Sequence, residues 1–165
     1  MDEKIREALH QAYAGEAKAS LRLKLYAEKA DKEGYPQIAR LFRVIALSEE
    51  IHGKRALAVL REVKSTEENI LSSFESEKNV AEVAYADMIK LANEAGDKAS
   101  ALHFTQSRDV EEVHAKLYKN ALDDMTNERV SEYYVCSLCG YVADGALPDQ
   151  CPVCGVSRDK FIHFQ

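Results

Sequence analysis

Four apolar stripes with helical spacing run through the first 125 residues, and they restrict the fold more than any other feature of the sequence. Within each stripe, small and aliphatic residues recur every three or four positions, as on the buried face of an amphipathic helix. The stripes are separated by segments typical of helix ends and starts, namely Gly34-Tyr35-Pro36, Ser65-Thr66-Glu67-Glu68 and Gly96-Asp97. Connections this short join antiparallel neighbours, so the sequence predicts an all-α four-helix bundle.

Ionisable residues interrupt all four stripes at matching depths. They are Glu16 in the first stripe, Glu49 and His52 in the second, Glu77 in the third, and Glu111 and His114 in the fourth. An ionised carboxylate buried between helices is costly unless it is paired or bound to a metal. A single residue of this kind is commonly just a charge on a helix surface. Interruptions in every helix are better explained by a shared metal site.

The same pattern is repeated along the chain. Glu49-Glu50-Ile51-His52 recurs as Glu111-Glu112-Val113-His114, and the lone glutamates Glu16 and Glu77 are 61 residues apart. The spacing of three residues puts Glu and His on one helix face. One Glu from each of two helices and Glu-x-x-His from each of the other two form the ligand plan of a dinuclear iron or manganese site. Glu49 and Glu111 are the expected bridging ligands.

Two C-x-x-C-G turns lie in the last 32 residues, Cys136 to Gly140 and Cys151 to Gly155, and hold all four cysteines. Each turn allows two thiolates to reach one ion, so Cys136, Cys139, Cys151 and Cys154 are expected to bind zinc or iron. A segment this short normally needs a metal or disulfides in order to fold. We therefore expect domains at residues 1–130 and 134–165, with a hinge at 127–132.

Composition excludes several other classes of protein. Apolar residues make up 46% and charged residues 30% of the chain, which is typical of a folded globular protein. The net charge of −6 argues against a nucleic-acid partner. The sequence shows neither an apolar run long enough for a membrane span nor the apolar centre of an export signal. A cytoplasmic location is expected, and it also disfavours disulfides between the cysteines.

Taken together, these motifs resemble the rubrerythrin family over nearly the whole chain. The landmarks are Ala14-Gly15-Glu16, Glu49-x-x-His52, Glu111-x-x-His114-Ala115-Lys116-Leu117-Tyr118, and Cys151-Pro152-Val153-Cys154-Gly155 through Phe161. The resemblance implies a ferritin-like bundle with two iron ions, followed by a rubredoxin-like domain in which the cysteines hold one iron ion, although spacing alone also permits zinc.

The resemblance also implies a function. Members of the family are cytoplasmic, oligomeric, non-haem di-iron peroxidases of oxidative-stress defence, so we expect reduction of hydrogen peroxide to water. The chain would act as the terminal component of an NADH peroxidase, with electrons supplied by a reductase or a rubredoxin. In the family these electrons pass through the cysteine site, commonly across a head-to-tail subunit pair. A homodimer or larger homo-oligomer is therefore expected.

Two positions depart from the family pattern. A second glutamate usually follows the third-helix ligand by three residues and exchanges with the second-helix His at the metal, whereas Val80 stands there in this chain. Glu82 lies about 140° around a regular helix from Glu77, so we do not count it as a replacement. A first-helix tyrosine is replaced by Leu23, while the third-helix Tyr85 is retained and is a candidate catalytic residue.

These departures keep two other functions open. The first is iron handling, in which the bundle oxidises iron with O2 or peroxide without sustained peroxidase turnover. The second is not enzymatic: the cysteines would hold a structural zinc, and the metals of the bundle would only stabilise the fold or sense metal. The colour of the purified protein separates zinc from iron at the cysteines, because ferric tetrathiolate is red.

Overall fold

A computed structural model describes residues 1–125 and 131–164 of the chain. It divides into two compact units, Met1–Lys64 and Ser65–Gln165. The expected hinge at residues 127–132 falls largely outside the described residues. The division into domains at 1–130 and 134–165 therefore stays a prediction.

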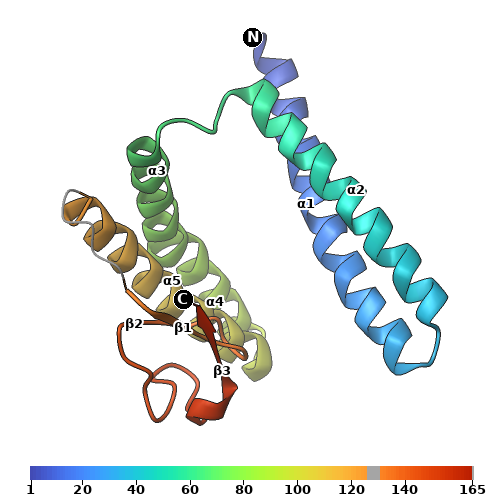
Figure 1. The fold of residues 1–165 in the computed structure, drawn as a ribbon. Helices are drawn as coiled ribbons and strands as arrows, with labels where there is room; N and C mark the ends of the chain where they lie inside the picture. Colours follow the sequence, from blue (N-terminus) through green and yellow to red (C-terminus); the bar gives the residue numbers. More distant parts are fainter. Residues whose placement is uncertain (126–130, 165) are drawn as a thin grey trace. The chain divides into compact units, whose positions relative to one another are not determined.

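The first unit is a hairpin of two long antiparallel helices, α1 (Glu3–Lys32) and α2 (Pro36–Leu60) (Figure 1). The turn contains Gly34 with a φ of +80°, a conformation that residues with a Cβ rarely adopt. Pro36 then begins α2, where its missing N–H leaves no hydrogen bond unmade. The predicted break between the first two helices is thus confirmed.

Small residues hold α1 and α2 close together. Ala27 and Ala30 of α1 and Ala39 of α2 form a buried cluster, with Phe42 packed against it. Gly53 of α2 also lies against α1, because a Cβ built there would lie 3.8 Å from the Cβ of Glu16. This close approach brings the side chain of Glu16 next to the residues of α2 that precede Gly53.

The second unit begins with another helical hairpin. Its first arm comprises α3 (Thr66–Asn79), a π-helical turn (Val80–Ala84) and α4 (Tyr85–Glu94), and its second arm is α5 (Lys98–Asp123). Ser65 caps α3 through the expected capping box: its hydroxyl accepts from the backbone N–H of Glu68, and the Glu68 carboxylate accepts from the backbone N–H of Ser65. Gly96, with a φ of +70°, lies in the connection to α5.

The π-helical turn was not expected from the sequence, which predicted one regular helix. In it the backbone N–H of Tyr85 donates to the carbonyl of Val80, five residues earlier. The turn therefore contains one more residue than an α-helical turn. The rotation of 100° per residue, from which Glu82 was placed about 140° around the helix from Glu77, does not hold through this turn. The side chain of Glu82 is 62% exposed and lies 4.0 Å from Lys78.

A small antiparallel sheet completes the second unit. Its strands are β1 (Tyr133–Cys136), β2 (Val142–Asp144) and β3 (Phe161–Phe164), in the order β2-β1-β3. A short 3₁₀ turn, Arg158–Lys160, leads into β3. Cys136 ends β1 and is buried, so the strand delivers the first cysteine to the interior of this small domain.

The predicted fold class is confirmed. Long antiparallel helices, which carry the Glu and Glu-x-x-His motifs, are followed by a small stranded domain that carries the four cysteines. A helix with the length and apolarity required to cross a membrane is not found among the described residues.

The capping box of α3 gives a stability prediction. Ser65→Ala removes the hydroxyl that accepts from the backbone N–H of Glu68 in the first turn and should lower the free energy of unfolding by about 1 kcal/mol. Ser72→Ala, at an exposed position inside α3, is the matched control and should be neutral or slightly stabilising. Urea unfolding followed by circular dichroism measures both. Equal effects of the two substitutions would contradict the assigned cap.

Candidate metal centres

Each helical hairpin brings one lone glutamate together with one Glu-x-x-His pair. In the first hairpin these are Glu16 of α1 and Glu49 and His52 of α2, and one potential ligand atom from each lies within 4.8 Å of the others. His52 Nδ1 lies 3.1 Å from Glu49 Oε2 and 3.8 Å from Glu16 Oε1. We call these residues the first triad.

The second triad has the same composition. Glu77 of α3 and Glu111 and His114 of α5 also place potential ligand atoms within 4.8 Å of one another. His114 Nδ1 lies 2.9 Å from Glu111 Oε2, and both side chains are about three-quarters buried. The repeat in the sequence is therefore matched by two equivalent clusters of side chains.

The chemistry of these clusters fits a bound cation. Burial raises the pKa of Glu77, and the charge of Glu111 together with its hydrogen bond raises it further, whereas His114 opposes the shift. Two carboxylates held this close repel each other unless they share a proton or a positive ion. Divalent iron satisfies such an oxygen and imidazole donor set.

The structure describes each triad within its own unit. That the six side chains of Glu16, Glu49, His52, Glu77, Glu111 and His114 bind one pair of metal ions remains a prediction from the repeat and the family resemblance. Val80 is half-buried and Glu82 lies outside the second triad. Neither residue therefore adds a ligand to that triad.

Tyr85 lies on the same seam between helices as the second triad. Glu77 meets Glu111 across this seam, and Tyr85 meets Phe104 with ring centroids 6.3 Å apart. In a regular α-helix Tyr85 would lie about 80° around from Glu77. The extra residue of the π-helical turn reduces this angle to about 20° and so aligns the two side chains. The regular spacing of apolar residues in this segment did not predict the π-helical turn.

The four cysteines of the small domain form a second kind of metal centre, which we call the knuckle. Their sulfurs lie within 4.8 Å of one another, with Cys136 to Cys154 at 3.6 Å and Cys139 to Cys151 at 3.5 Å. A tetrahedral site with metal–sulfur bonds of ~2.3 Å needs sulfur pairs about 3.8 Å apart. A disulfide needs about 2.05 Å. The arrangement therefore fits a metal, and all four cysteines are free.

Backbone geometry makes the two halves of the knuckle alike. Gly140 and Gly155 have φ values of +82° and +75°, and their N–H groups donate to the carbonyls of Cys136 and Cys151, both at 2.9 Å. The two C-x-x-C-G turns thus have the tight form that the sequence predicted.

The thiols of the knuckle differ in acidity. Burial raises the pKa of Cys136, but backbone N–H groups of Cys139 and Leu138 outweigh this effect and bring the value down to about 7. Burial raises the pKa values of Cys139 and Cys154. In the absence of a cation, these thiols cannot all ionise together. A metal ion supplies the charge that makes four thiolates stable.

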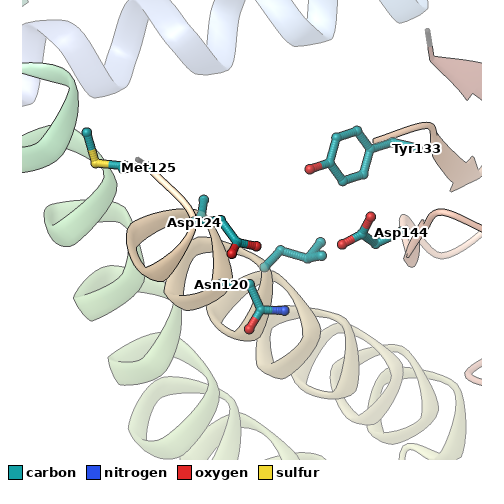
Figure 2. A pocket seen from close by; sticks show the side chains of 7 residues that line it. Asn120, Asp124, Met125, Tyr133 and Asp144 are labelled. Atoms are coloured by element: carbon teal, nitrogen blue, oxygen red, sulfur yellow. The ribbon is translucent and has the colours of Figure 1, made fainter. Parts of the chain in front are cut away.

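One contact and one cavity between the small domain and α5 were not predicted from sequence. His114 Nε2 lies 3.4 Å from the carbonyl oxygen of Gly140. Nearer the end of α5, a cavity of about 220 Å³ separates the helix from the sheet, and its lining includes Asn120, Tyr133 and Asp144 (Figure 2). Contacts between residues so far apart in the chain leave no periodic pattern by which the sequence could reveal them.

Comparisons with known proteins agree with both centres. A family model described as rubrerythrin matches residues 7–122, and a model of the rubredoxin-like domain of rubrerythrin matches residues 134–162. Rubrerythrin-2 of Clostridium acetobutylicum is 31% identical over 94% of each chain. Nigerythrin of Nitratidesulfovibrio vulgaris is 30% identical over 96% of this chain and 85% of its own.

A solved structure agrees as well. Fully reduced, all-ferrous nigerythrin superimposes with a TM-score of 0.61 at 29% identity, covering 96% of this chain and 86% of that chain.

The raised pKa of Glu77 predicts how removal of this carboxylate changes the thermal stability of the metal-free protein. With chelator at pH 7, Glu77→Gln should raise Tm by about 1–3 °C, a small effect because the side chain is partly solvated. Because folding raises the pKa of Glu77, the wild-type protein is destabilised at pH values above that raised pKa, where the carboxylate is ionised in the folded state. The gain should disappear below pH 4.5, the ordinary pKa, where Glu77 is protonated in both states.

Thermal unfolding followed by circular dichroism at several pH values checks this prediction. Glu82→Gln, at an exposed position on the same helical arm, is the control and should change Tm little. A gain for Glu77→Gln that is the same at pH 7 and pH 4 would contradict the assigned electrostatics.

The knuckle predicts a selective loss of metal. Cys139→Ser should abolish the absorption of ferric tetrathiolate and unfold the small sheet, while the metal bound by the helices stays. Ser137→Ala changes an exposed position in the same turn and should leave the colour intact. Metal analysis with a visible spectrum measures both. Loss of all metal from the Cys139→Ser protein would show that the two centres are not independent.

Proposed function

This chain belongs to the rubrerythrin family, and from that premise we propose that it reduces hydrogen peroxide to water at a dinuclear iron centre. Members of the family are peroxide-reducing oxidoreductases with a di-iron site and a rubredoxin-like site. The cofactors are accordingly two iron ions in the helical domain and one in the knuckle. The single observation that supports the proposed activity most strongly is the presence of two equivalent triads.

The two triads have defined roles in this proposal. Glu16, Glu49 and His52 together with Glu77, Glu111 and His114 would hold the iron pair, with Glu49 and Glu111 as the ligands that both ions would share. Four carboxylates balance the charge of two divalent ions. When bound, the ferrous pair supplies Lewis acidity and the two electrons that cleavage of the O–O bond requires.

Tyr85 is the proposed proton donor beside the centre. Its ring packs against Phe104 of α5, on the same side of the helical arm as Glu77. This packing and the π-helical turn orient the hydroxyl in the proposal. The overall reaction joins one peroxide, two protons and two electrons to give two water molecules. Tyr85 would relay one of these protons and be reprotonated from solvent.

Electrons reach the centre from the knuckle in this proposal. An Fe(Cys)4 site carries one electron at a time, with a potential set by hydrogen bonds to sulfur and by exposure. Two successive transfers are needed for each peroxide. The knuckle is reduced again by a one-electron donor protein, either a rubredoxin or an NADH-dependent reductase. We further propose that the protein is a cytoplasmic homodimer that takes part in oxidative-stress defence.

A second candidate function is ferroxidase activity, and Val80 favours it. The family's additional glutamate is replaced here by an aliphatic side chain, and Glu82 points to an ion pair with Lys78 instead. Ligand exchange at this position is therefore impossible in this chain. The alternative predicts a single oxidation event with O2 or peroxide and no sustained turnover.

Peroxide consumption by the iron-loaded protein with an NADH-dependent electron donor distinguishes the two functions. Wild type should consume many equivalents of peroxide, faster than the same amount of free iron. Consumption that stops after about one equivalent per iron pair would establish the ferroxidase alternative. A rate equal to that of free iron would contradict both.

Two variants test the assignment of residues. Glu111→Ala removes a proposed bridging ligand and should lower kcat by a factor on the order of 100 or more, with loss of bundle iron. Glu112→Ala, the exposed neighbour on α5, is the matched control and should retain both activity and iron. Full activity and iron content in the Glu111→Ala protein would overturn the site.

A further inference from the structure

A groove lies between α1 and α2 in the first hairpin. Its volume is about 340 Å³, and its lining includes Ser20 and Lys24 of α1 and Glu50 and Lys54 of α2. In a regular α-helix, Glu50 and Lys54 each lie about 160° around from His52. The groove therefore opens on the side of α2 opposite to the histidine of the first triad.

The groove nevertheless reaches the first triad. Glu49 belongs to that triad and is also part of the lining of the groove. Gly53 lines the groove as well, and a Cβ built on it would lie 3.8 Å from the Cβ of Glu16. Two of the three residues of the triad thus lie at the groove or against a residue that lines it.

Ser20 gives the groove a buried hydrogen-bonding group. Among residues 1–125 and 131–164 it is the one polar residue that is buried, with 6% of its surface exposed. Ala17, Leu21 and Leu57 line the same groove and offer no hydrogen bonds from their side chains. A serine hydroxyl both donates and accepts hydrogen bonds. A small polar molecule in the groove would therefore find a partner at Ser20.

Charged side chains at the groove favour some molecules over others. The carboxylate of Glu50 accepts from Lys54 at 2.6 Å and from Lys24 at 3.4 Å. Two positive charges and one negative charge leave this cluster with a net charge of +1, and Glu49, the remaining charged residue of the lining, is assigned to the metal pair. Such a cluster repels a ferrous ion but not an uncharged molecule or a small anion.

We propose that this groove is the entrance through which hydrogen peroxide reaches the metal pair, with the hydroxyl of Ser20 binding it on the way to Glu49. This inference rests on the proposed function. Peroxide is uncharged at neutral pH and both donates and accepts hydrogen bonds, as the hydroxyl of Ser20 does. A volume of about 340 Å³ holds several such molecules, because one water molecule occupies about 30 Å³ in the liquid.

This entrance also separates the two reactants. Peroxide that arrives through the groove approaches the metal pair from the side of Glu49 and binds in the groove without any bond being formed or broken. Ferrous ions, which the lysines at the groove repel, enter by another way. Substitutions in the groove should therefore affect peroxide and leave iron loading unchanged.

Two substitutions of nearly the same shape test the hydroxyl of Ser20. Ser20→Val should raise KM for peroxide about fivefold with little change in kcat, because one hydrogen bond to peroxide is lost. Ser20→Thr adds a methyl group but keeps a hydroxyl, so it is the matched control and should have a KM near that of wild type. Circular dichroism and iron content check that both proteins are folded and loaded. Equal KM values in the two variants would overturn the role of the hydroxyl.

Azide binding to the oxidised, iron-loaded protein tests the entrance without any turnover. Azide is a small anion, and stopped-flow absorption follows its binding to ferric ions. Ala17→Leu places a larger side chain in the groove and should slow azide binding about tenfold, because the added atoms fill the space that the ligand crosses. Ala17 is exposed, so the substitution should leave the hairpin folded.

Gln11→Leu is the matched control for Ala17→Leu. Gln11 is an exposed residue of α1 outside the lining of the groove, and its replacement also adds no charge. This variant should bind azide at the wild-type rate. An unchanged rate in the Ala17→Leu protein, or equal slowing in both variants, would overturn the entrance.

Iron loading separates this inference from the proposed function. The rate at which the metal-free protein takes up ferrous ions should be the same in wild type and in the Ala17→Leu protein. Equal slowing of ferrous uptake and azide binding would indicate damage to the metal site and overturn a separate entrance for peroxide. Azide binding that is slowed by Ala17→Leu, in a protein that consumes peroxide no faster than free iron, would instead overturn the proposed function alone.

Discussion

The mutual repulsion of carboxylates held inside helical hairpins is the constraint on which the rest of the structure depends. Each hairpin places two glutamates and a histidine with ligand atoms within 4.8 Å of one another, an arrangement that favours a cation over an empty site. The small residues between α1 and α2 and the π-helical turn before α4 serve this clustering. Gly53 brings Glu16 to α2, and the π-helical turn keeps Tyr85 in line with Glu77.

Much of this arrangement could be predicted from the sequence because it depends on local spacing. The Glu-x-x-His pairs, the C-x-x-C-G turns, the capping box at Ser65 and the helix start at Pro36 all involve neighbours within four residues. The π-helical turn could not be predicted, since the spacing of residues through Val80–Ala84 is that of one regular helix. The Gly140–His114 contact was also hidden, because nothing in the local sequence of either residue specifies the other. Correspondingly, the joint six-ligand centre stays a prediction from the repeat.

The two metal centres complement each other chemically. The helical triads offer oxygen and imidazole donors, which suit metal ions that change oxidation state during reaction with peroxide, whereas the knuckle offers thiolates, which suit reversible one-electron transfer. His114 belongs to one centre and touches the backbone of the other, so a single imidazole has a part in both. Val80 stands at the position where the resemblance to the family leads us to expect a further carboxylate, so this chain offers the two triads alone.

The most direct test of the central claim, that the two triads bind one pair of metal ions, is a low-temperature Mössbauer spectrum of the oxidised protein loaded with ⁵⁷Fe. The account predicts that two of every three iron ions form an antiferromagnetically coupled ferric pair with a diamagnetic ground state, and that the third has the signature of a ferric tetrathiolate. Two uncoupled high-spin ferric ions in oxygen and nitrogen coordination would contradict it, because each triad would then be a separate mononuclear site.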